Sequence, residues 1–75
     1  MDTKYREQFI KFGLKVQYYR KLQGLTQEAF ADEIGKSLSF VAKIESPTRV
    51  FGVSMETLFK IAEVLKVPVS KLFEE

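Results

Sequence analysis

Residues 27–44 decide the fold, and they read QEAFADEIGKSLSFVAKI. A small side chain at Ala31 lets a second helix pack closely, and Gly35 tolerates the positive φ expected in a tight turn. The apolar residues on either side of that turn are expected to point inward: Phe30, Ile34, Val41 and Ile44. We therefore predict two short helices that cross around a turn, over about residues 27–45. Two generic amphipathic helices joined by a glycine are the alternative interpretation.

A long first helix is predicted before this stretch. Apolar residues recur at steps of three and four, which places them on one helical face: Tyr5, Phe9, Phe12, Val16 and Tyr19. Asp2 or Thr3 can cap the start of this helix. It is expected to end near Gln23 and Gly24, because glycine readily adopts the conformation that closes helices.

Hydroxyl side chains mark where the next three helices begin: Thr26, Ser37 and Ser54. The fourth helix carries an apolar stripe of Leu58, Ile61, Ala62 and Leu65. Pro68 separates it from a short last helix that contains Leu72 and Phe73. Period-two alternation is absent, so the sequence predicts an all-α fold, with residues 1–75 as a single domain.

The composition excludes several chemistries. The 75 residues contain no cysteine and no histidine, which removes disulfides, thiolate metal sites and the commonest general base. The carboxylates of Glu28, Asp32 and Glu33 have the spacing of a solvated helix face, so we expect no catalytic residue, metal, cofactor or small-molecule ligand. The N-terminus lacks a secretory pattern and no stretch reaches membrane-spanning length, which predicts a cytoplasmic location without membrane contact.

The charge is small but unevenly distributed. The net charge is +2, and residues 1–25 carry six basic against two acidic side chains. Residues 26–45 carry two basic against four acidic ones, and residues 46–75 carry four of each. Charge alone favours ordinary solvated helix faces over a nucleic-acid surface.

Five segments carry a resemblance to a known family: FGLKVQYYR (12–20), GLTQEAFA (24–31), IGKS (34–37), VAKIE (41–45) and LFKIAEVLKVPVSKLF (58–73). With them, the chain from Phe12 to Phe73 resembles the lambda-repressor-like helix-turn-helix family, also known as the Cro/C1 or XRE type. The resemblance implies five helices, the second and third of which form a pair that binds double-stranded DNA. It also implies a homodimer on a roughly palindromic operator.

The resemblance implies a role for individual residues. The recognition helix, Ser37 to Glu45, enters the major groove and presents the candidates for reading bases: Leu38, Ser39, Ala42 and Lys43. The candidates for phosphate contacts are Gln27, Lys36, Ser37, Thr48 and Arg49. Arg20 and Glu45 match family positions that pair with each other, and we interpret them as a structural ion pair rather than a DNA contact.

The chain also departs from the family. The loop from Ser46 to Val53 is about two residues longer than the common form, and Val50, Phe51 and Val53 are apolar where polar residues are frequent. These three either fold onto the core, which we favour, or form a patch for a partner. Phe40 replaces a hydroxyl-bearing residue and is expected to pack against the fourth helix or the loop.

The first helix is expected to be extended at its N-terminus over residues 2–11. This extension places Ile10 and Leu14 on a second apolar strip. The strip either packs against the last helix or joins Val69 and Phe73 in a dimer interface, and Phe51 is a further candidate for such a surface. The residues do not favour one reading over the other.

A DNA-binding regulator of transcription, acting as a repressor, is the function that these features favour. The alternative is a protein-interaction module or an antitoxin-type partner protein with the same fold. Its support is the thin positive charge around the recognition helix and the apolar loop. An enzyme is the third and least favoured hypothesis, because no nucleophile–base set, phosphate loop or metal cluster is present.

Overall fold

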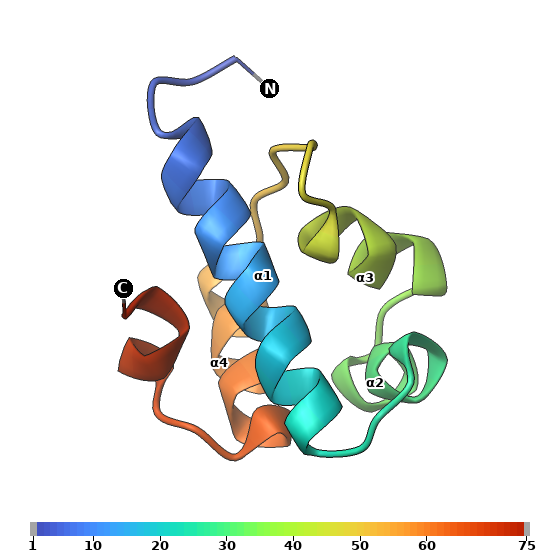
Figure 1. The fold of residues 1–75 in the computed structure, drawn as a ribbon. Coiled ribbons are helices and arrows are strands. Elements are labelled where there is room, and N and C mark those ends of the chain that lie inside the picture. Colours follow the sequence, from blue (N-terminus) through green and yellow to red (C-terminus); the bar gives the residue numbers. More distant parts are fainter. Residues whose placement is uncertain (1, 75) are drawn as a thin grey trace.

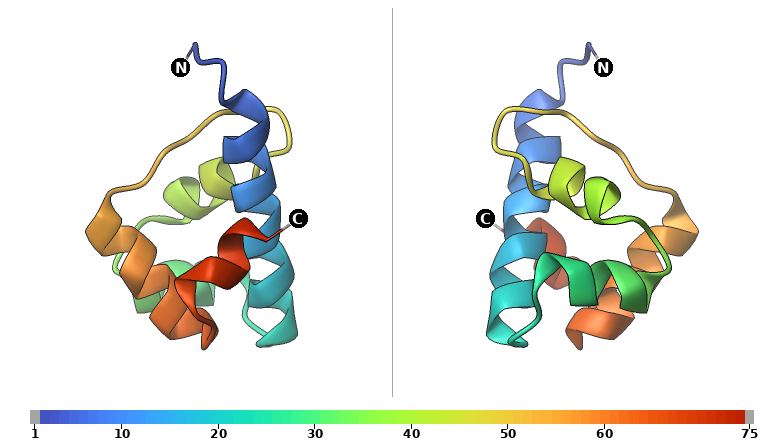
Figure 2. Two further views of the ribbon diagram at one scale, coloured as in Figure 1. Left: turned by 90° about the vertical axis from the view of Figure 1, so that its left-hand side faces the viewer. Right: turned by 90° about the vertical axis from the view of Figure 1, so that its right-hand side faces the viewer.

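The computed structural model describes residues 2–74, which form four α-helices, a final 3₁₀ helix and no strand. In chain order they are α1 (Arg6–Leu22), α2 (Gln27–Ile34), α3 (Leu38–Glu45), α4 (Met55–Leu65) and η1 (Val69–Phe73). Figure 1 and the side views in Figure 2 show α2 and α3 on one side of α1 and η1 on the other. The prediction of an all-α fold is confirmed for this part of the chain. None of its helices has both the length and the apolar character needed to cross a membrane.

Three hydroxyl side chains start helices as predicted. Thr26, Ser37 and Ser54 have extended backbones, and each side-chain oxygen accepts the N–H of the residue three positions later. The N···O distances are 3.0, 3.0 and 3.1 Å. Each such cap contributes about 1 kcal/mol to helix stability. Ser37 is therefore the cap of α3 and lies just outside it.

The start of α1 differs from the prediction. The helix begins at Arg6 rather than at residue 2 or 3. The Thr3 hydroxyl accepts the Tyr5 N–H at 3.1 Å, and this local turn competes with a helix. Tyr5 is consequently the N-cap, and it is 53% exposed instead of lying on the buried face of α1. The expected extension over residues 2–11 is helical only from Arg6 onward.

The last element is a 3₁₀ helix where the resemblance implied a fifth α-helix. Pro68 precedes it with an extended backbone, and the Lys71 N–H donates to the Pro68 carbonyl at 3.0 Å, three residues back. A bond over three residues is that of a 3₁₀ helix, whereas an α-helix bonds over four. The predicted packing is partly present, because Leu72 is buried whereas Phe73 is largely exposed.

One apolar core joins all five elements. Its largest fully buried side chains are Val16, Phe30, Val41, Ile61, Leu65 and Leu72. The stripe predicted for α4 is confirmed, because all four of its residues are buried. The loop residue Val50 is buried, and Phe51 and Val53 pack against the core, as favoured from the sequence.

The backbones of α1 and α3 approach each other at Gly13. A Cβ on this residue would lie 1.8 Å from the carbonyl oxygen of Ile44. Glycine is needed here for the close approach of two helices, not for an unusual φ. The contact fixes the C-terminal end of α3 against the middle of α1.

Candidate nucleic-acid interface

The turn between α2 and α3 is closed by local backbone bonds. Gly35 lies in the left-handed region, with φ 71° and ψ 33°. The Gly35 N–H donates to the Asp32 carbonyl at 3.2 Å, and the Lys36 N–H donates to the Ala31 carbonyl at 2.9 Å. These two bonds make a Schellman motif, which ends α2 and directs the chain into α3. The predicted glycine turn is confirmed.

The inward faces of α2 and α3 hold the pair together. Phe30, Ile34, Val41 and Ile44 are all buried, as predicted, and so is Ala31 at the crossing. Their burial leaves the opposite face of α3 open. Leu38 is 49% exposed there, Ser39 and Ala42 are exposed, and Lys43 is half-buried. The four residues expected to read bases therefore share one side of α3, and their role stays a prediction.

Four of the residues expected to contact phosphates are exposed in the loops around α3, but some of them already take part in hydrogen bonds. Lys36 and Arg49 are exposed. Ser37 is exposed too, but its oxygen already accepts the Phe40 N–H. Thr48 is exposed, and its carbonyl oxygen accepts a hydrogen bond from the Arg6 guanidinium. These residues border α3 at its start and in the loop that follows it.

Arg20 of α1 and Glu45, the last residue of α3, form a buried ion pair. Arg20 Nε lies 2.7 Å from Glu45 Oε2 and Nη2 lies 3.0 Å from Oε1, while the two side chains are 8% and 1% exposed. Arg20 Nη1 also donates to the Leu25 carbonyl at 2.6 Å. A buried pair of this kind is tolerated because the remaining hydrogen-bonding groups are also satisfied.

Two glutamines complete this network. The Gln27 amide nitrogen donates to Glu45 Oε1 at 3.0 Å, and the Gln17 amide nitrogen donates to the same oxygen at 3.4 Å. The network thus joins α1, α2 and α3. It also changes the expectation for Gln27, because one amide N–H points inward to Glu45. Only the other N–H, or the N-terminal backbone of α2, is left for a phosphate.

Two aromatic rings and two lysines form a second group, which links α3 to the residues just before it and to the loop after it. Phe40 and Phe51 pack edge to face, with ring centroids 5.1 Å apart, so Phe40 contacts the loop as predicted. Lys36 Nζ lies 5.2 Å from the Phe40 centroid, and Lys43 Nζ lies 5.8 Å from the Phe51 centroid. We call these four residues the lysine–phenylalanine platform.

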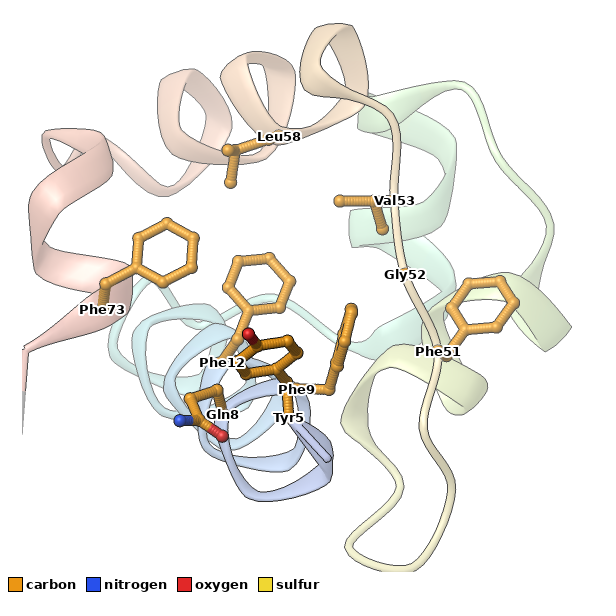
Figure 3. Close-up of a pocket in the computed structure, with 9 residues that line it drawn as sticks. All are labelled: Tyr5, Gln8, Phe9, Phe12, Phe51, Gly52, Val53, Leu58 and Phe73. Atoms are coloured by element: carbon orange, nitrogen blue, oxygen red, sulfur yellow. The ribbon is translucent and has the colours of Figure 1, made fainter. Parts of the chain in front are cut away.

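The candidates for a dimer or partner surface are spread over the molecule. Phe73 stacks on Phe12 with centroids 5.3 Å apart, and Val69 packs against the core. Ile10 is half-buried and Leu14 is exposed. Phe73 and Phe51 lie on opposite sides of an apolar cavity of about 350 Å³, and the Phe51 ring points away from its centre (Figure 3).

A family model described as helix-turn-helix matches residues 16–72. The chain belongs to the XRE-type, lambda-repressor-like helix-turn-helix family. It is 34% identical over 61 residues to YazB of Bacillus subtilis, an uncharacterized HTH-type transcriptional regulator, covering 81% of this chain and 86% of YazB.

Solved structures of this helix-turn-helix family have the same architecture. The restriction-modification controller protein C.AhdI from Aeromonas hydrophila is 32% identical, with a TM-score of 0.76 over 87% of this chain and 96% of C.AhdI. SinR, the master regulator for biofilm formation, was solved in complex with DNA. It is 28% identical, with a TM-score of 0.75 over 84% of this chain and 98% of SinR.

Four contacts of the site in this helix-turn-helix chain were not predicted from the sequence. Gln17 lies one helical turn before Arg20, a spacing that could have suggested a shared partner. Lys36 and Phe40 are four residues apart, so their contact was also readable from the spacing. The contacts of Arg6 with Thr48 and of Phe51 with Lys43 join distant segments, and no local pattern signals them.

Proposed function

We propose that this chain is a sequence-specific regulator of transcription that binds double-stranded DNA, and that it represses as a homodimer. The observation that carries the proposal is the open outer face of α3, with Leu38, Ser39 and Ala42 exposed on a helix propped by α2. The complex of SinR with DNA and the regulatory role in the names of C.AhdI and YazB support it.

In this proposal α3 lies in the major groove. Leu38 contacts a thymine methyl group, Ser39 contacts a base or a phosphate, and Lys43 donates to guanine or to a phosphate. Lys36 and Arg49, which are exposed on either side of α3, contact the DNA backbone. One short helix reads few bases, so a two-fold dimer with its recognition helices about 34 Å apart provides the specificity.

The test begins with selection of duplexes from a random library, followed by anisotropy titrations of the selected and a scrambled duplex. Affinity is expected to fall steeply with salt, because phosphate contacts release counterions. Lys43→Ala is expected to weaken binding to the selected duplex by about 1–3 kcal/mol. Lys71→Ala is the matched control, because it removes an exposed lysine from η1, on the far side of α1.

The alternative is a protein-interaction module or antitoxin-type partner that uses the same fold. The excess of acidic over basic residues in 26–45 favours it, because it thins the positive charge near α3. Salt-independent binding, or no binding to any duplex by the folded protein, would count against the DNA-binding proposal. A Lys43→Ala protein that binds as well as the unsubstituted one would remove Lys43 from the interface.

A further inference from the structure

The loop between α3 and α4 places one aromatic ring beside α3, and contacts on several sides hold that ring. Val50, directly before Phe51, is buried. Thr48, three residues before Phe51, is bonded through its carbonyl to Arg6 of α1. The Phe51 ring itself meets Phe40 edge to face, at an interplanar angle of 86°. A loop anchored in this way gives Phe51 a defined position.

Lys43 is a second residue of α3 that lies next to this ring. Its ammonium nitrogen lies 5.8 Å from the Phe51 centroid, within the range of a cation–π interaction. The lysine is half-buried. A lysine side chain has many rotamers in solution, and a ring that holds the ammonium group reduces the entropy lost when that group binds an anion.

The chemical nature of the group next to a lysine decides whether the lysine charge stays available to an anion. Lys60 on α4 and Lys71 on η1 lie 3.1 and 3.4 Å from the carboxylates of Glu63 and Glu74. A carboxylate cancels the charge of a lysine, whereas an aromatic face holds the lysine without cancelling its charge. The two lysines of the platform lie over rings. Their charges therefore stay available to an anion.

We infer that Phe51 is a positioning residue, which holds the Lys43 ammonium group at the outer side of α3 for contact with DNA. Phe40 supports the Phe51 ring from its edge and holds Lys36 in the same manner. This inference rests on the proposed function, since it concerns how Lys43 meets the duplex. It accounts for apolar residues at positions 40 and 51, next to a surface expected to bind a polyanion.

A double-mutant cycle on the full chain tests the inference, using anisotropy titrations with the selected duplex at one salt concentration. Phe51→Leu is expected to weaken binding about two- to fivefold when Lys43 is present, and by less than about 1.5-fold in the Lys43→Ala background. Phe51→Tyr keeps an aromatic face and is expected to retain affinity within about 1.5-fold. Thermal melts followed by circular dichroism establish that each variant folds.

A second cycle separates positioning from general damage to the loop. Arg49 lies in the same loop and is exposed, whereas the Phe51 ring contacts Phe40 and Lys43. If Phe51→Leu merely loosened the loop, it would couple to Arg49→Ala as strongly as to Lys43→Ala. The inference requires coupling to Lys43 that exceeds coupling to Arg49.

The free protein supplies a readout that needs no DNA. The methylene protons next to Lys43 Nζ lie near the Phe51 ring, so their NMR resonances are expected upfield of those in the Phe51→Leu variant. Absence of this shift overturns the inference, and so do additive effects of Phe51→Leu and Lys43→Ala in a protein that binds DNA. If the unsubstituted protein binds no duplex, the proposed function falls and the inference falls with it.

Discussion

The two connections of α3 are built by different means. The connection that enters it, residues 35–37, is closed by two backbone hydrogen bonds, a left-handed glycine and a serine cap. The connection that leaves it, residues 46–54, also has local bonds, between Ser46 and Thr48 and at the Ser54 cap. It is held in addition by side chains of α1 and α3, through Arg6 and Phe40. The first connection is encoded locally, whereas the second depends in part on the assembled fold. The start of α3 is therefore specified by residues that adjoin it in the sequence.

The end of α3, where the leaving connection begins, depends most strongly on α1. Gly13→Ala would place a methyl group 1.8 Å from the Ile44 carbonyl oxygen, and neither backbone can move without disturbing its helix. We expect the free energy of unfolding to fall by about 3 kcal/mol, as measured by urea denaturation. In a domain of this size that is a large part of the total.

Leu14→Ala is the control for this effect, because Leu14 is the next residue of α1 and is exposed. It is expected to cost less than about 1 kcal/mol. Equal destabilisation by the two substitutions would show that the backbones of α1 and α3 are not in contact at Gly13.

In the entering connection, a substitution at Gly35 is expected to destabilise the protein through backbone strain alone. No atom lies within 4 Å of a Cβ added to Gly35, so Gly35→Ala introduces no clash. An L-residue in the left-handed region costs about 1–2 kcal/mol, and we expect that loss in urea denaturation. Gly35→Asn is expected to recover part of it, since asparagine tolerates this conformation better. An alanine variant as stable as the unsubstituted protein would mean that the turn can adopt another shape.

The same division explains how much could be predicted from the sequence. The Gly35 turn, the caps Thr26, Ser37 and Ser54, and the inward apolar residues follow from local chemistry and helical periodicity. The predicted start of α1 was wrong because the Thr3 hydroxyl can either cap a helix or accept the Tyr5 N–H in a local turn. The spacing of apolar residues does not distinguish these two bonding patterns.

Most of the contacts that sequence reasoning missed at the site join distant segments. Gln27 matched a phosphate-binding position, yet its amide donates to a carboxylate 18 residues later, at the end of α3. Phe51 was a candidate for a partner surface, yet its ring meets Phe40 and Lys43. Both outcomes depend on how closely α1, α2 and α3 pack, which is set by the whole fold rather than by any one helix.

The smallest effect on stability, and the most local one, is expected at Arg6. Arg6→Ala removes the bond to the Thr48 carbonyl, which is exposed, so the free energy of unfolding should fall by less than about 1 kcal/mol. The loop should nevertheless open more often, because its link to α1 is lost. Trypsin cleavage after Arg49, followed by mass spectrometry of the fragments, is expected to become faster. Lys4→Ala, which removes the same charge two residues earlier, should leave this rate unchanged. Equal rates in all three proteins would mean that the leaving connection holds its shape without α1, and the contrast between the two connections would disappear.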